Sequence, residues 1–203
     1  MQNSLIVFVK NPIEGQVKTR LAASTGHPAA TVVYRKLLKH TGSVVNSSQQ
    51  IYDFYCQVYY ASAPPNTPTW GYENQVQRGD DLGQRMYNVL AEHHAKGYDA
   101  AVLIGSDCLE IGPHHLTAAF EALKTYDVVI GPANDGGYYL IGTTKPLPYL
   151  FEGIHWSSAT VLSETLLKIK ANQASLYLLE SLNDLDDYED YRKAKKRLRK
   201  IEI

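Results

Sequence analysis

Short apolar runs rich in β-branched residues alternate with segments of helical periodicity, and this alternation limits the folds open to the chain. The first run, residues 5–9, is continuously apolar, which is typical of a strand buried on both faces. Further strands are predicted over residues 52–60, 100–104, 127–130, 138–141 and 176–179. Helical spacing lies at 33–38, 82–90, 116–123, 162–169 and 191–201. The pattern predicts one α/β domain over residues 1–203, a three-layer sandwich with a mostly parallel mixed central sheet.

Two long segments lack both periodicities and are predicted to be loops. The first is the polar stretch from residue 10 to about residue 20, directly after the first strand. The second covers about residues 62–81, where Pro64, Pro65 and Pro68 interrupt any regular pattern.

The charge balance excludes some classes of partner. The chain has 20 basic and 21 acidic residues and a formal net charge of -1, so no overall field attracts nucleic acid or an anionic membrane. Its two cysteines, Cys56 and Cys108, make no disulfide framework, which fits a reducing compartment. No apolar stretch approaches the roughly 18 residues of a membrane helix. We therefore expect a cytoplasmic protein without nucleic-acid or membrane partners.

The loop after the first strand carries three cations, Lys10, Lys18 and Arg20, together with Gly15. In open α/β sheets, ligands bind at the carboxyl ends of strands. Lysine and arginine there can neutralise a polyphosphate, arginine through a bidentate fork. The alternative is a solvated surface loop, and the segment is not a Walker loop because Gly-Lys-Ser/Thr is absent.

Asp107 lies just past the strand at residues 100–104, within Gly105-Ser106-Asp107-Cys108. A carboxylate there is well placed for Mg²⁺, which usually takes one or two carboxylates together with phosphate oxygens and water. The alternative is that Asp107 caps a turn or the next helix.

Asp135, Gly136 and Gly137 separate two predicted strands. Asp-Gly in this position is a strong hairpin signal. The alternative is that the glycines let the backbone approach a ligand closely. We predict that Gly136 or Gly137 has a positive φ or has no room for a Cβ.

Acidic residues crowd the segment at 184–190, ahead of a helix whose end is basic. The helix dipole explains Glu189 and Asp190. It does not explain the three aspartates of the turn itself, Asp184, Asp186 and Asp187, because like charges that close repel one another unless a cation or a cap compensates them.

Taken together, these motifs resemble a family. The resemblance rests on residues 8–12 with Gly15 and 18–21, and on residues 79–86, 105–108, 131–142, 156–158 and 182–187, in the family's order. The chain is similar to small bacterial glycosyltransferase-like proteins with the nucleotide-diphospho-sugar transferase (GT-A type, Rossmann-like) fold. That family is related to cofactor guanylyltransferases and sugar nucleotidylyltransferases.

The resemblance implies a nucleotide site over the N-terminal half of the sheet, where Lys18 and Arg20 face the phosphates. It implies that Asp107 and Asp186 share Mg²⁺ or Mn²⁺, with Asp184 as an alternate ligand. The full set of implied nucleotide-binding residues is Lys10, Gly15, Lys18, Arg20, Asp81, Gly136 and Gly137.

The sequence departs from the family pattern at two places. Leu109 stands where the family often has proline, and Asp186-Asp187 stands where related enzymes often have Asp-Thr. The second departure replaces a hydroxyl with a charge, which concerns the fine geometry of a metal site rather than its existence.

Two reactions fit the resemblance, each with a small-molecule acceptor. In nucleotidylyl transfer, a phosphate or carboxylate acceptor attacks the α-phosphorus of a nucleoside triphosphate, and no protein nucleophile is needed. In glycosyl transfer from a nucleotide-sugar, an acceptor-side base is needed in an inverting enzyme, and Asp135 is the candidate. We favour the first because three cations suit a triphosphate better than a diphosphate. A non-catalytic nucleotide-binding protein is a third option, and a homodimer is compatible with each.

Both reactions place Asp107 and Asp186 together. Each follows a predicted strand, and strand ends of the same polarity lie along one edge of a parallel sheet. We therefore expect the two carboxylates to converge.

Overall fold

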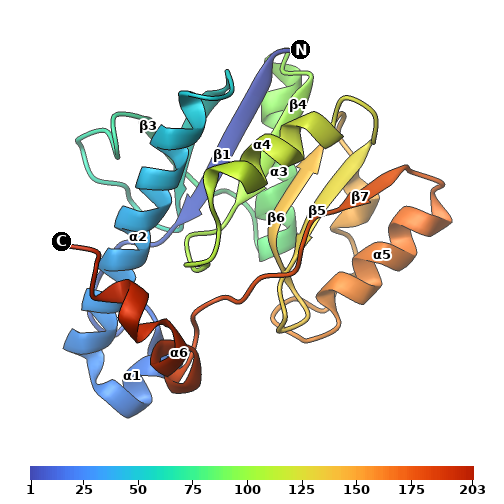
Figure 1. Cartoon of the computed structure of the whole chain (residues 1–203). Coiled ribbons are helices and arrows are strands. Elements are labelled where there is room, and N and C mark those ends of the chain that lie inside the picture. Colours follow the sequence, from blue (N-terminus) through green and yellow to red (C-terminus); the bar gives the residue numbers. More distant parts are fainter.

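A seven-stranded sheet in the order β3-β2-β1-β4-β6-β5-β7 forms the centre of the computed structural model, which describes residues 1–203 (Figure 1). Only β6 runs antiparallel to its neighbours, β4 and β5. The predicted mixed, mostly parallel sheet is therefore confirmed. The strands are β1 (Asn3–Val9), β2 (Tyr55–Tyr60), β3 (Glu73–Val76), β4 (Ala100–Ile104), β5 (Val128–Pro132), β6 (Tyr138–Thr143) and β7 (Leu176–Leu178).

Helices cover both faces of the sheet. They are α1 (Thr19–Thr25), α2 (His27–Gln49), α3 (Leu82–Ala95), α4 (Pro113–Ala122), α5 (Val161–Ala171) and α6 (Tyr188–Leu198), with a 3₁₀ turn η1 (Pro148–Leu150). Leu5 and Val7 of β1 pack with α2 and α4, whereas Ile6 and Phe8 pack with α3 and α5. This two-sided burial is why β1 is an unbroken apolar run in the sequence. None of these helices combines the length and the apolar character that crossing a bilayer requires.

A third apolar cluster joins α1, α2 and α6 at one end of the molecule (Figure 1). Leu21 of α1, Leu37 of α2 and Leu198 of α6 are buried in it. Two hydrogen bonds to backbone carbonyls reinforce it, from Lys36 Nζ to Leu198 O (2.9 Å) and from Arg197 Nη2 to Leu109 O (2.9 Å). The basic C-terminal helix is thus fixed beside α1.

The second predicted loop is wrong in part, whereas the first agrees with the structure. β3 lies within the segment expected to be irregular, and it pairs in parallel with β2 at the sheet edge. Its residues are mostly exposed, so the strand shows no apolar pattern. In the first loop, α1 begins at Thr19, and Gly26 with φ 83° separates it from α2.

The strand order reverses between β1 and β4. β1 pairs in parallel with β2 on one side and with β4 on the other. Such a reversal leaves a crevice at the carboxyl ends of the two strands, where ligands bind in open α/β sheets. Lys10 follows β1 at this crevice, and Gly105 to Asp107 follow β4.

Gly136 lies in the turn between β5 and β6 with φ 93°, so the predicted positive φ is confirmed. A Cβ on Gly136 would collide with the backbone of Ala159. The Gly136 carbonyl also accepts a hydrogen bond from Leu162 N (2.8 Å). The hairpin therefore packs tightly against the start of α5.

Gly136→Ala is expected to lower the free energy of unfolding by about 2–3 kcal/mol, because it combines left-handed strain with a backbone collision. Gly15 is the matched control: its φ is 80°, but a methyl group there would meet no atom within 4 Å. Gly15→Ala should therefore lose only about 1 kcal/mol. Urea unfolding measures both, and equal losses would mean that the Ala159 contact contributes nothing.

Candidate functional site

A buried tyrosine of α2 links the two strand ends at the crevice. The Tyr34 hydroxyl accepts a hydrogen bond from Lys10 N (2.8 Å) and forms another with Ser106 Oγ (3.0 Å). Burial raises the pKa of Tyr34 to about 12, so its hydroxyl stays protonated. The loops that follow β1 and β4 are thus fixed relative to each other by one side chain.

The segment after β7 crosses the same edge of the sheet. Leu182 N donates to Pro132 O (3.0 Å), at the end of β5, and Leu185 N donates to Asp107 O (3.0 Å), past the end of β4. Figure 1 shows this segment crossing the lower part of β5 and β6 on its way to α6. Its path places Asp184 and Asp186 beside Asp107.

Lys18 lies between the converging carboxylates. Its Nζ is 2.7 Å from Asp107 Oδ1 and 2.9 Å from Asp186 Oδ1, and its side chain is only 4% exposed. Lys18 has left-handed backbone angles, φ 48° and ψ 45°, directly before α1. The two carboxylates therefore converge on one cation, as their places in the sequence led us to expect.

Lys18, Asp107 and Asp186 form a triad in which the protonation of each group depends on the others. Burial lowers the pKa of Lys18, but Asp107 and Asp186 outweigh it and raise that pKa above its ordinary value. Burial likewise raises the pKa of Asp186, but the Lys18 ammonium holds it below its ordinary value. Both partners of this ion pair are therefore stable in their charged forms.

This geometry corrects one premise of the sequence prediction. The motifs predict that Lys18 is a loop cation facing phosphates, whereas its ammonium is buried against two carboxylates. The sequence does not predict that a lysine here has left-handed backbone angles. A role towards phosphate requires the ammonium to leave at least part of this pairing.

Asp184 has no ion-pair partner. Its pKa is raised to about 7, chiefly by burial and next by the neighbouring Asp107 charge. It lines the same cavities as Asp107 and is the third carboxylate at this position.

A cleft of about 720 Å³ opens over the triad and adjoins a second cavity of about 400 Å³. Most of the predicted site residues line the larger cleft: Lys10, Lys18, Arg20, Asp107, Asp135, Gly137, Asp184 and Asp186. The smaller cavity is mainly apolar, with Phe8, Met86, Leu103 and Leu140 in its walls.

Three predicted residues line neither cavity. Asp81 is the N-cap of α3, where its side chain accepts a hydrogen bond from Gln84 N (2.7 Å). Gly15 lies in an exposed turn, and Gly136 packs under Ala159. Asp135 does line the cleft, but its Oδ1 accepts from Gly137 N (3.0 Å), which closes the hairpin turn.

The sequence prediction gave no site role to the loop at residues 156–159, which forms one wall of the cleft. Trp156 packs so closely on α3 that a Cβ at Gly83 would collide with the indole. Tyr34 and Tyr138 were also missed, although both line the two cavities. Gly83 and Trp156 both lie in the family motifs, so the sequence does point to the loop. Tyr34 and Tyr138 cannot be told apart from core residues by their sequence.

The three carboxylates beside the cleft fit a divalent cation by their chemistry. Asp107, Asp184 and Asp186 offer carboxylate oxygens, the donors that Mg²⁺ and Mn²⁺ take. One cation, the Lys18 ammonium, already contacts two of them simultaneously.

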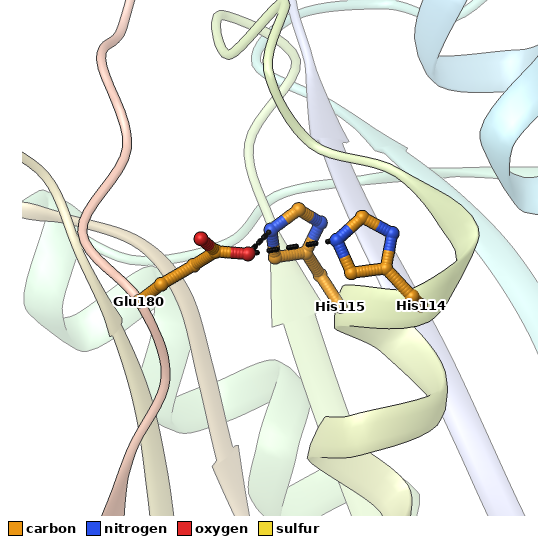
Figure 2. A group of neighbouring side chains, drawn as sticks. All are labelled: His114, His115 and Glu180. Carbon is orange, nitrogen blue, oxygen red and sulfur yellow. Dashed lines mark hydrogen bonds and ion pairs between the residues drawn. The ribbon is translucent and has the colours of Figure 1, made fainter.

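A second cluster of metal-ligand residue types, His114, His115 and Glu180, is explained without a metal (Figure 2). His115 Nδ1 accepts a hydrogen bond from Gly112 N (2.9 Å), so in the neutral ring Nε2 carries the proton and donates to Glu180 Oε1 (2.9 Å). Burial lowers the pKa of His115, which favours this neutral form. Neither ring nitrogen then has a free lone pair for a metal. The cluster instead ties the start of α4 to the segment that carries Asp184 and Asp186.

Comparison with known proteins agrees with the fold. Residues 56–158, about half of the chain, match the family described as "Uncharacterized protein conserved in bacteria (DUF2064)". None of the curated proteins matches the chain. A solved protein of Desulfovibrio desulfuricans G20, provisionally named a nucleotide-diphospho-sugar transferase, is 29% identical, with 100% of both chains covered and a TM-score of 0.83.

Two more distant structures share the fold. CMP:2-keto-3-deoxy-manno-octonic acid synthetase, solved with CTP, is 10% identical over 98% of this chain and 99% of its own, with a TM-score of 0.61. Rv0371c of Mycobacterium tuberculosis H37Rv, solved with manganese, is 14% identical over 95% and 97%, with a TM-score of 0.51. The nucleotide-diphospho-sugar transferase fold expected from the sequence motifs is confirmed.

The raised pKa of Asp184 gives the metal-free protein a pH signature. Between the ordinary value of 3.8 and about 7, the folded protein keeps a proton that the unfolded chain has released. Stability from this group therefore falls as the pH rises through that window. Asp184→Asn removes the titration, so wild type should lose stability relative to the variant from about pH 4 to about pH 7. Urea unfolding in EDTA measures this, and parallel pH curves would contradict it.

Proposed function

The chain belongs to the DUF2064 family of bacterial proteins, and we propose that it is a metal-dependent nucleotidylyltransferase. The observation that carries the proposal is the contact of one buried cation with both Asp107 and Asp186, under a cleft that Lys10 and Arg20 also line. Two acids and several cations at the carboxyl-end edge of the sheet suit a metal-bound polyphosphate. The substrate would be a nucleoside triphosphate, with a small phosphate- or carboxylate-bearing acceptor.

Asp107 and Asp186, with Asp184 beside them, would hold Mg²⁺ or Mn²⁺. When bound, the ion supplies charge neutralisation at phosphate oxygens. Support comes from the oxygen donors themselves and from the manganese in the Rv0371c structure.

The cations of the cleft would bind the phosphates that leave. Lys10 and Arg20 are exposed side chains at its rim, free to reach an anion. Arginine can grip two phosphate oxygens at once, whereas lysine acts as a point charge. Together they would orient the β- and γ-phosphates and neutralise pyrophosphate as it departs.

The reaction needs no protein nucleophile. An oxygen of the acceptor attacks the α-phosphorus, the bond to the bridging oxygen of the β-phosphate breaks, and pyrophosphate leaves with that electron pair. Such chemistry depends on positioning and charge neutralisation. The one thiol near the site, Cys108, is buried, and burial raises its pKa to about 12, so it is no thiolate at neutral pH.

Glycosyl transfer from a nucleotide-sugar is the second candidate. It is favoured by the provisional name of the Desulfovibrio protein, which is similar over its whole length. Asp135, exposed in the same cleft, would be the base for the acceptor. Its hydrogen bond from Gly137 N leaves only part of the carboxylate for that role.

A thermal-shift panel tests the proposal. Nucleoside triphosphates with Mg²⁺ are expected to raise the melting temperature of wild type. Asp107→Asn should abolish the part of this rise that depends on Mg²⁺. Asp53→Asn, an exposed acid ahead of β2 at the opposite sheet edge, is the control and should behave as wild type. A shift with nucleotide-sugars alone would favour glycosyl transfer. No shift with either class would contradict nucleotide binding and with it the proposal.

A further inference from the structure

The Lys18 ammonium occupies the position that a shared divalent cation would take. It contacts Asp107 Oδ1 at 2.7 Å and Asp186 Oδ1 at 2.9 Å. With its side chain 4% exposed, water contributes little to its solvation. Asp107 and Asp186 themselves are about 40% exposed, so they stay open to the cleft on their other side.

An ammonium and a divalent cation cannot share these two oxygens. Both are cations, and at contact distance in a partly buried site their repulsion is weakly screened. A metal that binds these two Oδ1 atoms must therefore displace Lys18, and an ammonium displaced without a new partner would remain buried at high cost.

The cleft supplies a new partner only when an anion is present. Lys18 lines it together with Thr19 and Arg20, where the proposed phosphates would lie. The flexible four-carbon stem of lysine allows Nζ to move from a carboxylate to a phosphate without a change of backbone. In this new position the ammonium keeps an anionic partner while the carboxylates become free.

We propose that Lys18 holds the cation position until a phosphate ligand draws it away, so that metal and phosphate enter together. The proposal rests on the proposed function and makes the substrate a metal–polyphosphate complex rather than a free metal followed by a nucleotide. Because coupling between two ligands is reciprocal, the phosphate ligand should tighten metal binding by the factor by which metal tightens phosphate binding.

Manganese binding in the absence of nucleotide tests the exchange. Free Mn²⁺ is measured by electron paramagnetic resonance while wild type, Lys18→Met and Lys10→Met are titrated. Lys18→Met should bind Mn²⁺ about tenfold more tightly than wild type or better, in the usual range of coupling between sites. Lys10→Met is the matched control, because it removes one exposed cation from the same cleft but no contact with the carboxylates. It should change the affinity far less.

The outcomes separate two failures. If wild type binds Mn²⁺ as tightly as Lys18→Met, or if Lys10→Met gains as much, the exchange is wrong while the metal site stands. If none of the three proteins binds Mn²⁺, and adding Asp107→Asn to Lys18→Met changes nothing, the metal site of the proposed function is wrong as well.

Two further measurements cover a variant that fails to fold. Lys18→Gln is neutral but can still donate a hydrogen bond to one carboxylate, so it should fold where Lys18→Met does not and show the same direction of change. Wild-type crystals with Mn²⁺ and CTP give a test without any variant. Lys18 Nζ must have left both Oδ1 atoms where manganese lies between them, and manganese with both ion pairs intact would overturn the proposal.

Discussion

The two ion pairs of Lys18 are the interaction on which the sheet edge depends. One ammonium joins the loop after β4 to the turn before α6, two segments far apart in the sequence. Removing Lys18 would leave two carboxylates facing each other without their cation, and like charges at that distance repel. Removing one aspartate would leave the ammonium paired with the other. The triad is therefore a structural tie, and with Asp184 beside it, it places three carboxylates and a cation where a ligand can bind.

Hydrogen bonds around the triad hold its side chains in place. The Tyr34 hydroxyl fixes the ends of β1 and β4, and the hydrogen bonds of Leu182 and Leu185 fix the crossing segment. The contact of His115 with Glu180 ties the same segment to the start of α4 (Figure 2). Groups held by strand ends and buried hydrogen bonds keep their geometry better than groups on free loops, which is what catalysis by positioning requires.

The sequence predicts the parts of this arrangement that depend on periodicity and strand polarity. The apolar run at residues 100–104 predicts a strand and forms β4, and the convergence of Asp107 with Asp186 follows from parallel strand ends. β3 is missed because Glu73–Val76 is a polar edge strand without alternation. The burial of Lys18 could not be predicted, because it depends on a left-handed backbone and on two carboxylates that only the tertiary fold brings near. Asp187, one of the three aspartates in the turn, proves to be the N-cap of α6.

The central claim is that Asp107 and Asp186 share one cation, and a double-mutant cycle tests it most directly. Affinity for Mg²⁺ with a nucleoside triphosphate would be measured for wild type, Asp107→Asn, Asp186→Asn and the double variant. If one ion bridges both carboxylates, the double variant loses little more than either single variant, with a coupling of about 0.5–3 kcal/mol. Losses that simply add would contradict the account, because they would mean that the two carboxylates act on separate partners.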